Sequence, residues 1–306
     1  MMIQRVLLQF ARGFAMGASD VVPGVSGGTI ALILGIYNGL IHNIGIGSKA
    51  LGRLVRGDVA GFTERLKSVD WLFLIPLLAG IGAAVAILAS VIESALRDYP
   101  EAMAGLFFGL VIGSIVVARS LLHAPSTRHA GIAVAVGLAT FILLGFQSGP
   151  ISDPGPGALV GAGAVAICAM ILPGISGSFI LLMIGMYAAV LDAVDERHLD
   201  EIALVAMGSI IGLALFSSGL NYVLEHHHDT VMAALIGLML GSLRVLWPWP
   251  NGVGIIDHDE TISGTGLDLP NGAPWVVPVL LAAASATLVV AVSRFAHTDA
   301  EESHVA

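Results

Sequence analysis

The chain has 306 residues, of which 56% are hydrophobic and only 11% are charged, and its net charge is −9 at pH 7. Soluble domains carry roughly 25% charged residues, so this composition excludes an ordinary soluble protein and indicates an integral membrane protein. The apolar runs are long and unbroken by strand-type alternation, which favours membrane helices. No basic patch indicates a nucleic-acid partner.

Two apolar runs are too long for a single membrane span and are interrupted by proline and glycine. The first covers about residues 6–42 and contains Pro23-Gly24, and the second covers about residues 157–194 and contains Pro173-Gly174. A membrane helix needs about 20 consecutive apolar residues. Six other runs come near this length, at about residues 71–92, 102–122, 131–146, 202–224, 231–247 and 275–292. The chain is therefore predicted to contain a broken segment followed by three spans, twice.

The two broken segments share residues at a constant offset of 150 positions. The identical pairs are Pro23/Pro173, Gly24/Gly174, Ser26/Ser176, Gly27/Gly177, Ile30/Ile180, Leu32/Leu182, Gly35/Gly185 and Tyr37/Tyr187. Because the identities include proline, serine and tyrosine, we interpret them as an internal repeat. Residues 1–150 and 151–306 are then the two repeats of one integrated membrane domain.

We expect each broken segment to enter and leave the membrane on the same side, as a re-entrant helical hairpin. The N-terminus, the loops near 43–70, 120–130 and 225–230, and the C-terminus then share one face. That face holds ten basic residues and the other holds three. Such an excess marks the cytoplasmic side, so both termini are predicted to be cytoplasmic. A model with single crossings splits the charges nine to four, and only the length of the broken segments favours hairpins.

Three spans separate the hairpins, so the second hairpin must enter from the opposite face. The predicted fold class is thus an all-α integral membrane protein of two inverted repeats, each a broken re-entrant helical hairpin followed by three transmembrane helices. Residues 48–69 alternate apolar and charged faces at helical spacing, which predicts an amphipathic helix on the cytoplasmic leaflet or on the protein's own loops. The last ten residues form an acidic, polar tail with no expected regular structure.

The repeated motif has the chemistry of an anion site. Proline and glycine end a helix, and a serine two residues later is a good N-cap for a new one. A helix start exposes N–H groups with partial positive charge, to which a phosphate or carboxylate binds. The alternative is that the motif only turns a tight hairpin. The candidate phosphate-binding residues are Pro23, Gly24, Ser26, Gly27, Gly28, Thr29, Pro173, Gly174, Ser176, Gly177 and Ser178.

Three charged residues are further candidates. Asp20 precedes the first motif, and an ionisable residue within the membrane is a functional candidate, here for a coupling proton or sodium ion. Its alternative role is a salt bridge to Arg12. Arg119 and Arg244 stand near the ends of predicted spans, where each either clamps phosphate oxygens or extends to lipid headgroups. No metal site and no cofactor are predicted, and the oligomeric state is not indicated.

The stretches "SDVVPGVSGGTIALILGIY" and "ILPGISGSFILLMIGMY" resemble the domain of unknown function 368 family, the polyprenyl-phosphate transporters of PopT type. The resemblance covers about residues 5–295. It implies a flippase in the cell membrane that returns a polyprenyl phosphate, undecaprenyl or dolichol-type, for envelope polymer synthesis. It also implies that the motifs at residues 23–28 and 173–178 hold the phosphate headgroup. The chain departs from symmetry at Asp20/Met170 and Gly28/Ser178.

Two other functions stay open from the residues alone. A small-anion transporter or channel would use the same helix starts. A membrane lipid phosphatase is a third reading, but neither motif contains a His, Glu or Arg to serve as nucleophile, acid or base. We therefore expect a transporter and no enzyme.

Overall fold

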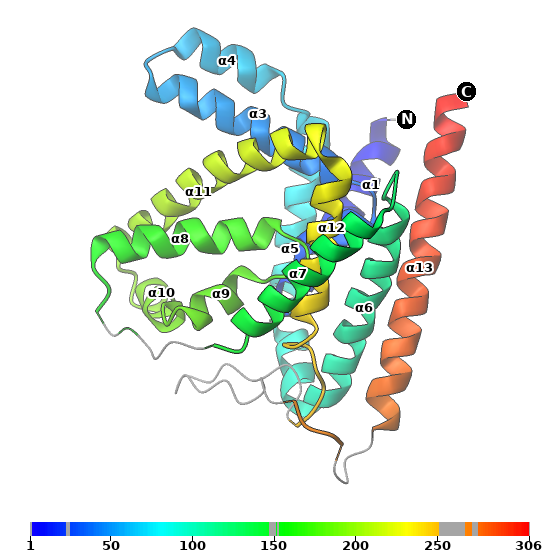
Figure 1. The fold of residues 1–306 in the computed structure, drawn as a ribbon. Helices are drawn as coiled ribbons and strands as arrows, with labels where there is room; N and C mark the ends of the chain where they lie inside the picture. The colour runs from blue at the N-terminus through cyan, green and yellow to red at the C-terminus, as the bar shows by residue number, and fades with distance from the viewer. Residues whose placement is uncertain are drawn as a thin grey trace.

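The structure, a computed structural model, describes residues 2–22, 25–146, 151, 153–250, 267–270 and 275–305, with side chains as far as Arg294. The described residues form thirteen helices and no strand (Figure 1). The first seven are α1 (Met2–Asp20), α2 (Gly27–Ile33), α3 (Tyr37–Val55), α4 (Val59–Lys67), α5 (Trp71–Asp98), α6 (Pro100–Ser120) and α7 (Thr127–Leu143). The other six are α8 (Pro156–Ile171), α9 (Gly177–Met183), α10 (Tyr187–Asp195), α11 (Leu199–His226), α12 (His228–Ser242) and α13 (Val276–Val305).

Several helices are long and apolar enough to cross a membrane, so the predicted all-helical membrane protein is confirmed. They are α5, α6, α11 and residues 276–294 of α13, and the pair α9 and α10, bent by 114°, makes a fifth candidate. The spans predicted at 131–146 and 231–247 correspond to α7 and α12, which have only 17 and 15 residues. α12 ends at Ser242 in a turn that Pro248 and Pro250 follow, and proline cannot continue a helix.

The helices pair in two matching sets. α1 packs along α5, and α8, its equivalent by the 150-residue offset, packs along α11. Gly13 of α1 lies against the Leu77 carbonyl, and its equivalent Gly163 lies against the Val205 carbonyl. The remaining pairs cross between halves, because α7 packs on α12 while α13 packs on α6. Exchanging the halves therefore reproduces these four pairs.

Each broken segment has a second break that the sequence analysis missed. The prediction of one break in each hairpin, with a continuous helix after it, is wrong. A helix of seven residues ends before Gly35 in one half and before Gly185 in the other. Both glycines have positive φ, 69° and 72°, a conformation that glycine adopts at little cost. The next helix then begins at Tyr37 or Tyr187. The sequence signal was present, since glycine and tyrosine recur at the same offset.

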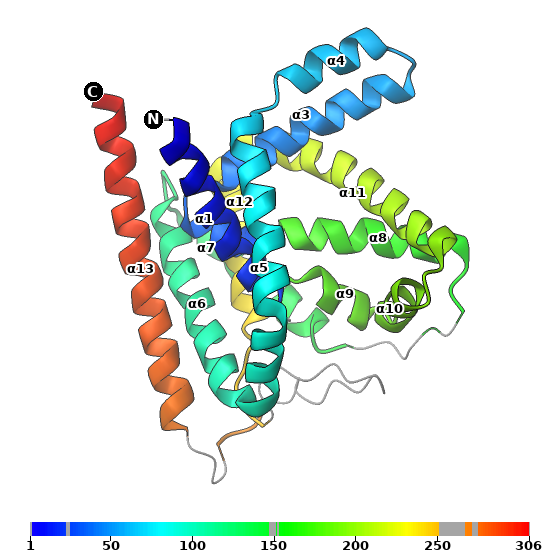
Figure 2. The same cartoon turned by 180° about the vertical axis from the view of Figure 1, so that it is seen from behind.

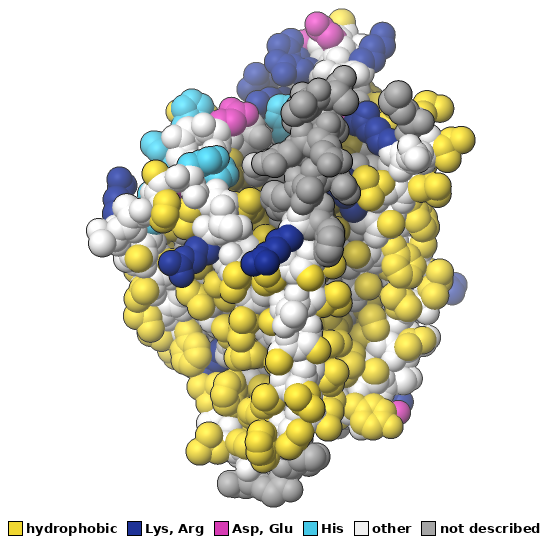
Figure 3. All heavy atoms as spheres, turned by 90° about the vertical axis from the view of Figure 1, so that its right-hand side faces the viewer, with side chains coloured by type: hydrophobic (Ala, Val, Ile, Leu, Met, Phe, Trp, Pro, Cys, Tyr) yellow, Lys and Arg dark blue, Asp and Glu magenta, His cyan; other side chains and the backbone are white. Residues whose placement is uncertain are grey.

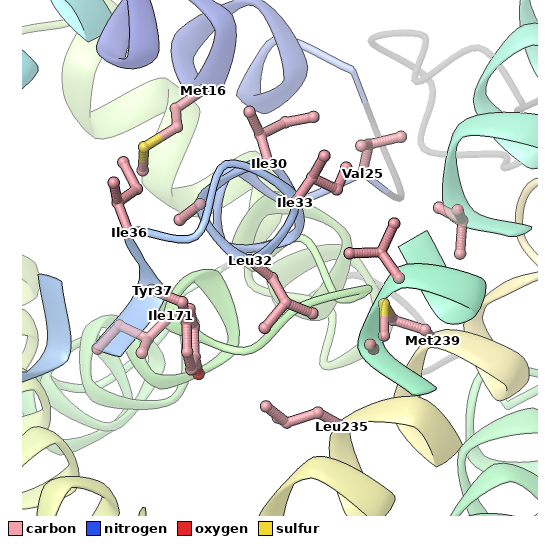
Figure 4. Close-up of a cluster of buried hydrophobic side chains, with 14 of the residues drawn as sticks. Met16, Val25, Ile30, Leu32, Ile33, Ile36, Tyr37, Ile171, Leu235 and Met239 are labelled. Carbon is pink, nitrogen blue, oxygen red and sulfur yellow. The ribbon is translucent and has the colours of Figure 1, made fainter. Parts of the chain in front are cut away.

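α2 lies at the centre of the molecule, and all seven of its residues are buried. Figure 4 shows Ile30, Leu32 and Ile33 of this helix among side chains from α1, α8 and α12, including Ile171 and Met239. Because lipid tails are as apolar as these side chains, close van der Waals packing, and not removal from water, stabilises this arrangement. The first broken segment is therefore fixed in the interior by packing.

The polar ends of the chain gather at one end of the molecule. Both termini, the α3–α4 hairpin and the junction of α11 with α12 lie there (Figures 1 and 2). The α6–α7 loop joins them, since His123 N donates to Asp229 Oδ1 at 3.0 Å. Figure 3 shows most basic and histidine side chains toward this end, above a surface of hydrophobic side chains. We call it the basic end.

The single amphipathic helix predicted at 48–69 is wrong. α3 runs on to Val55, the chain reverses at Gly57 with φ 79°, and α4 begins after Asp58 as N-cap. Asp58 accepts a hydrogen bond from Gly61 N at 2.8 Å and pairs with Arg53 at 2.8 Å. The tail differs from expectation too, because α13 continues to Val305.

Candidate functional site

The start of α2 is closed by groups from its own half. Ser26 is the N-cap residue (φ −123°, ψ 136°), and its Oγ accepts a hydrogen bond from Gly28 N at 3.1 Å. Asp20 Oδ1 accepts a hydrogen bond from Gly27 N at 2.5 Å. Thr29 N donates to Ser26 O at 2.9 Å. The first three N–H groups of α2 are therefore already bonded, and a ligand has to displace an acceptor to reach them.

Asp20 lies against backbone rather than against a cation. It makes no ion pair with any residue that the structure describes, so the salt bridge to Arg12 considered from the sequence is not formed. A Cβ added at Gly27 would lie 2.6 Å from Asp20 Oδ2, so a glycine is needed there for the carboxylate to approach. The Asp20 carboxyl group therefore occupies the first N–H of α2.

The start of α9 has different chemistry. Ser176 has an N-cap backbone (φ −91°, ψ 136°) but makes no capping bond, and its Oγ lies 2.8 Å from Ser178 Oγ. Met170, the equivalent of Asp20, lies against Gly177. No described residue accepts a hydrogen bond from the N of Gly177 or Ser178. Two N–H donors and one of the two hydroxyl protons are therefore left for another acceptor.

The two broken segments are in direct contact inside the molecule. Ser26 Oγ donates to Met170 O at 2.9 Å, across 144 residues of sequence. Gly174 N donates to Thr29 Oγ1 at 2.8 Å, across 145 residues. Ser26 is 1% exposed and Thr29 is fully buried. These two bonds hold the start of α2 against the turn that leads into α9.

The turn before α9 is described completely, and the turn before α2 is not. Pro173 and Gly174 are buried, and Gly174 has φ +89°. A Cβ at Gly174 would lie 2.8 Å from Met239 Cα of α12, so only glycine fits this close approach. Pro23 and Gly24, the other predicted site residues of this kind, lie outside the described residues.

The two arginines proposed as phosphate clamps lie at opposite ends of the molecule, so one headgroup cannot contact both. Arg119 is exposed at the basic end, in the last turn of α6. Arg244 follows α12 at the other end, where its Nη1 donates to Phe141 O at 3.2 Å. Its Nε is buried without a partner in the described part of the chain. Val245, the next residue, packs on Phe179 of α9, so Arg244 is the candidate nearer the second motif.

An apolar cleft of about 770 Å³ lies between α8, α11 and α12. Its lining includes Cys168 and Leu172 of the second broken segment, and Leu172 directly precedes Pro173. Leu215 and Leu235 form part of the opposite walls. Sequence reasoning missed this cleft, because its walls come from three helices that are remote in the chain.

One histidine cluster lies apart from the motifs. His123, His228 and Asp229 bring their ligand atoms within 4.8 Å of one another at the basic end. The Asp229 carboxylate also accepts hydrogen bonds from the N of His123 and Ala124, at 3.0 and 2.8 Å. We interpret the cluster as the tie between the α6–α7 loop and α12.

Comparison with known proteins identifies the relatives of this chain. Residues 16–262 match the VCA0040-like family, described as undecaprenyl phosphate translocase-like. The polyprenyl-phosphate transporter of Vibrio cholerae serotype O1 is 36% identical over 306 residues, covering 95% of this chain and 97% of that protein. The polyprenyl-phosphate transporter of Staphylococcus aureus is 32% identical over 259 residues, covering 79% and 86%. No solved structure matches the chain. The chain therefore belongs to the undecaprenyl phosphate translocase-like family.

Proposed function

We propose that this protein moves a polyprenyl phosphate lipid across the cell membrane and binds its headgroup where the two broken segments meet. The family and the names of both relatives support the lipid class. The observation that carries the site is the contact of the two motifs through Ser26–Met170 and Gly174–Thr29 in the interior. The site chemistry recognises the phosphate, which undecaprenyl and dolichol-type lipids share.

The headgroup binds first at α9 in this proposal. No described residue accepts a hydrogen bond from the N–H groups of Gly177 and Ser178. The hydroxyls of Ser176 and Ser178 bond only to each other among the described residues, which leaves one hydroxyl proton for the headgroup. A phosphate monoester offers several strong acceptor oxygens for such donors. Both α2 and α9 have only seven residues, so free N–H groups, and not a long helix dipole, are the basis of the site.

The lipid tail stays in an apolar environment. The cleft of about 770 Å³ reaches Leu172, one residue before the second motif, and its other walls belong to α11 and α12. Isoprenoid chains are apolar, and exposing one to water costs about 0.8 kcal/mol per CH₂ group, so the tail has to stay in lipid or in an apolar cleft. A headgroup at α9 with its tail in this cleft therefore satisfies both ends of the lipid.

Alternating access would come from two inverted repeats, residues 1–150 and 151–306. The matched pairs α1–α5 and α8–α11, and the exchanged pairs α6–α13 and α7–α12, support this symmetry. Repeats of this kind move substrate by rocking around a site at their junction. The basic end, which holds both termini, faces the cytoplasm in this proposal.

Asp20 would couple transport to a proton or a sodium ion. Its carboxylate occupies Gly27 N–H, a donor that the headgroup needs in order to use α2 as well as α9. Neutralising Asp20 weakens this bond and removes its repulsion of phosphate. Cation uptake by Asp20 would thus open the first half-site. No further cofactor or metal enters the proposal.

A transport assay tests the function. Proteoliposomes that contain a polyprenyl phosphate in both leaflets are treated with an added phosphatase that cannot cross the membrane. We expect release of the inner-leaflet phosphate with the unaltered protein, and slow release with Ser176→Ala/Ser178→Ala. The control is Ser94→Ala on α5, where the hydroxyl bonds only to Ser90 O. Release limited to the outer leaflet with the unaltered protein contradicts the proposal.

The same vesicles test the alternatives. Flux of chloride or inorganic phosphate without any lipid requirement would favour a small-anion transporter, which the free donors at α9 also suit. Phosphate release without added phosphatase would favour an enzyme. The family and its named transporters support transport, and no catalytic role is proposed for any residue of the motifs.

A further inference from the structure

A groove of about 640 Å³ separates the α3–α4 hairpin from α11 at the basic end. Four basic side chains line its hairpin side: Lys49, Arg53, Arg56 and Arg65. The α11 side is apolar, and Ile211 and Leu215 belong to it. The groove therefore has a cationic wall facing a hydrocarbon-like wall.

Most of the positive charge in the groove is unpaired. Arg53 forms an ion pair with Asp58 at 2.8 Å. The side chains of Lys49, Arg56 and Arg65 make no hydrogen bond or ion pair with any described residue. The floor is polar and fixed, because Ser48 Oγ of α3 donates to Ala214 O of α11 at 2.6 Å. Three free cations thus face one cavity whose shape is set by α3 against α11.

The apolar wall connects this groove to the cleft at the second motif. Leu215 lines the groove and also lines the cleft that reaches Leu172. Leu215 is 73% exposed and Ile211 is 45% exposed, as expected for side chains that face hydrocarbon. One helix, α11, therefore carries a continuous apolar surface from the second motif to the basic groove.

We propose that this groove is a second binding site for the same lipid, holding the phosphate at the basic end while the tail lies on α11. This inference rests on the proposed function and adds a site at which the headgroup enters or leaves the protein. Basic residues near a membrane also extend to bulk lipid headgroups. Lys67, on the same helix as Arg65, does not line the groove, whereas four other basic side chains converge on it opposite an apolar wall, which favours a defined site.

A binding measurement on the full chain in detergent tests the groove. The probes are farnesyl phosphate, farnesol and inorganic phosphate. We expect Arg56→Gln/Arg65→Gln to weaken one of two farnesyl phosphate sites about tenfold or more, because two charge-assisted contacts are lost. Lys67→Gln is the matched control and should bind as the unaltered protein does. Arg56→Lys/Arg65→Lys keeps the charge and should retain most of the affinity.

The outcomes separate this inference from the proposed function. Equal binding by Arg56→Gln/Arg65→Gln and Lys67→Gln, with loss in Ser176→Ala/Ser178→Ala, overturns the groove and leaves the transport site standing. Inorganic phosphate or farnesol binding in the groove as tightly as farnesyl phosphate also overturns it, because the site requires both charge and tail. Absence of any farnesyl phosphate binding by the unaltered protein contradicts both proposals.

Discussion

Replacing Asp20 with asparagine tests how the first half-site opens. Asparagine keeps an oxygen near Gly27 N but removes the negative charge. A hydrogen bond to a charged acceptor contributes about 1.5–3 kcal/mol and a neutral one about 0.5–1.5 kcal/mol, so the substitution weakens the hold on this donor by about 1 kcal/mol. If the headgroup competes for the same N–H, Asp20→Asn should bind farnesyl phosphate about fivefold more tightly.

The assay is a farnesyl phosphate titration of the purified protein, accompanied by a transport measurement. Tighter binding with loss of the proton or sodium dependence of transport is the expected pair of results. Asp98→Asn, on the exposed end of α5, controls for the loss of one negative charge. Weaker binding by Asp20→Asn would refute the reasoning, because it would mean that the carboxylate helps to hold the headgroup instead of competing with it.

Three further predictions concern the cap of α2, the packing of α8 on α11 and the α3–α4 turn. Ser26→Ala should lower the melting temperature in detergent, because the cap on Gly28 N and the bond to Met170 O are lost, at a cost of about 1–3 kcal/mol in stability. Ser176 makes no capping bond, so Ser176→Ala should leave the melting temperature unchanged and weaken farnesyl phosphate binding. Gly208→Ala should destabilise the packing of α8 on α11, because the added Cβ would meet the Val160 carbonyl. Gly161→Ala on α8 is the control, because a Cβ there would meet no neighbouring atom. Equal melting temperatures of the two variants would contradict this prediction. Hydrogen bonds from the Gly61 N–H and from Arg53 lower the pKa of Asp58. The α3–α4 turn should therefore be protected from hydrogen exchange above the usual carboxyl pKa and lose protection as the pH falls through the lowered pKa. Loss of protection already above the usual carboxyl pKa would contradict this prediction.

Much of the membrane architecture was predictable from apolar run length. The spans at α5, α6, α11 and α13 were found because composition alone sets them. α7 begins four residues before its predicted span, and α12 ends five residues before its predicted end. α12 lies largely buried among other helices, so its ends are set by tertiary packing and by the prolines after it. The amphipathic segment was misread because Gly57 and Asp58 reverse a pattern that is otherwise continuous.

The candidate site was predictable in its residue types but not in its partners. The serine and glycine positions at both helix starts follow from capping rules, and α2 and α9 begin where those rules predict. The hydrogen bond from Gly27 N to Asp20 was not predicted. These residues are seven positions apart across a break, so sequence spacing alone does not show that they meet. The bond from Ser26 to Met170 O uses a backbone acceptor, which carries no sequence signal.

Headgroup binding at α9 is tested most directly by the position of a bound phosphate relative to labelled backbone nitrogens. Solid-state NMR of ³¹P in farnesyl phosphate and ¹⁵N in glycine and serine can report which amides lie at hydrogen-bond distance. We predict contacts to the amides of Gly177 and Ser178, and to that of Gly27 when Asp20 is replaced by asparagine. Phosphorus contacts confined to side chains at the two ends of the molecule, with none to these amides, would contradict the account.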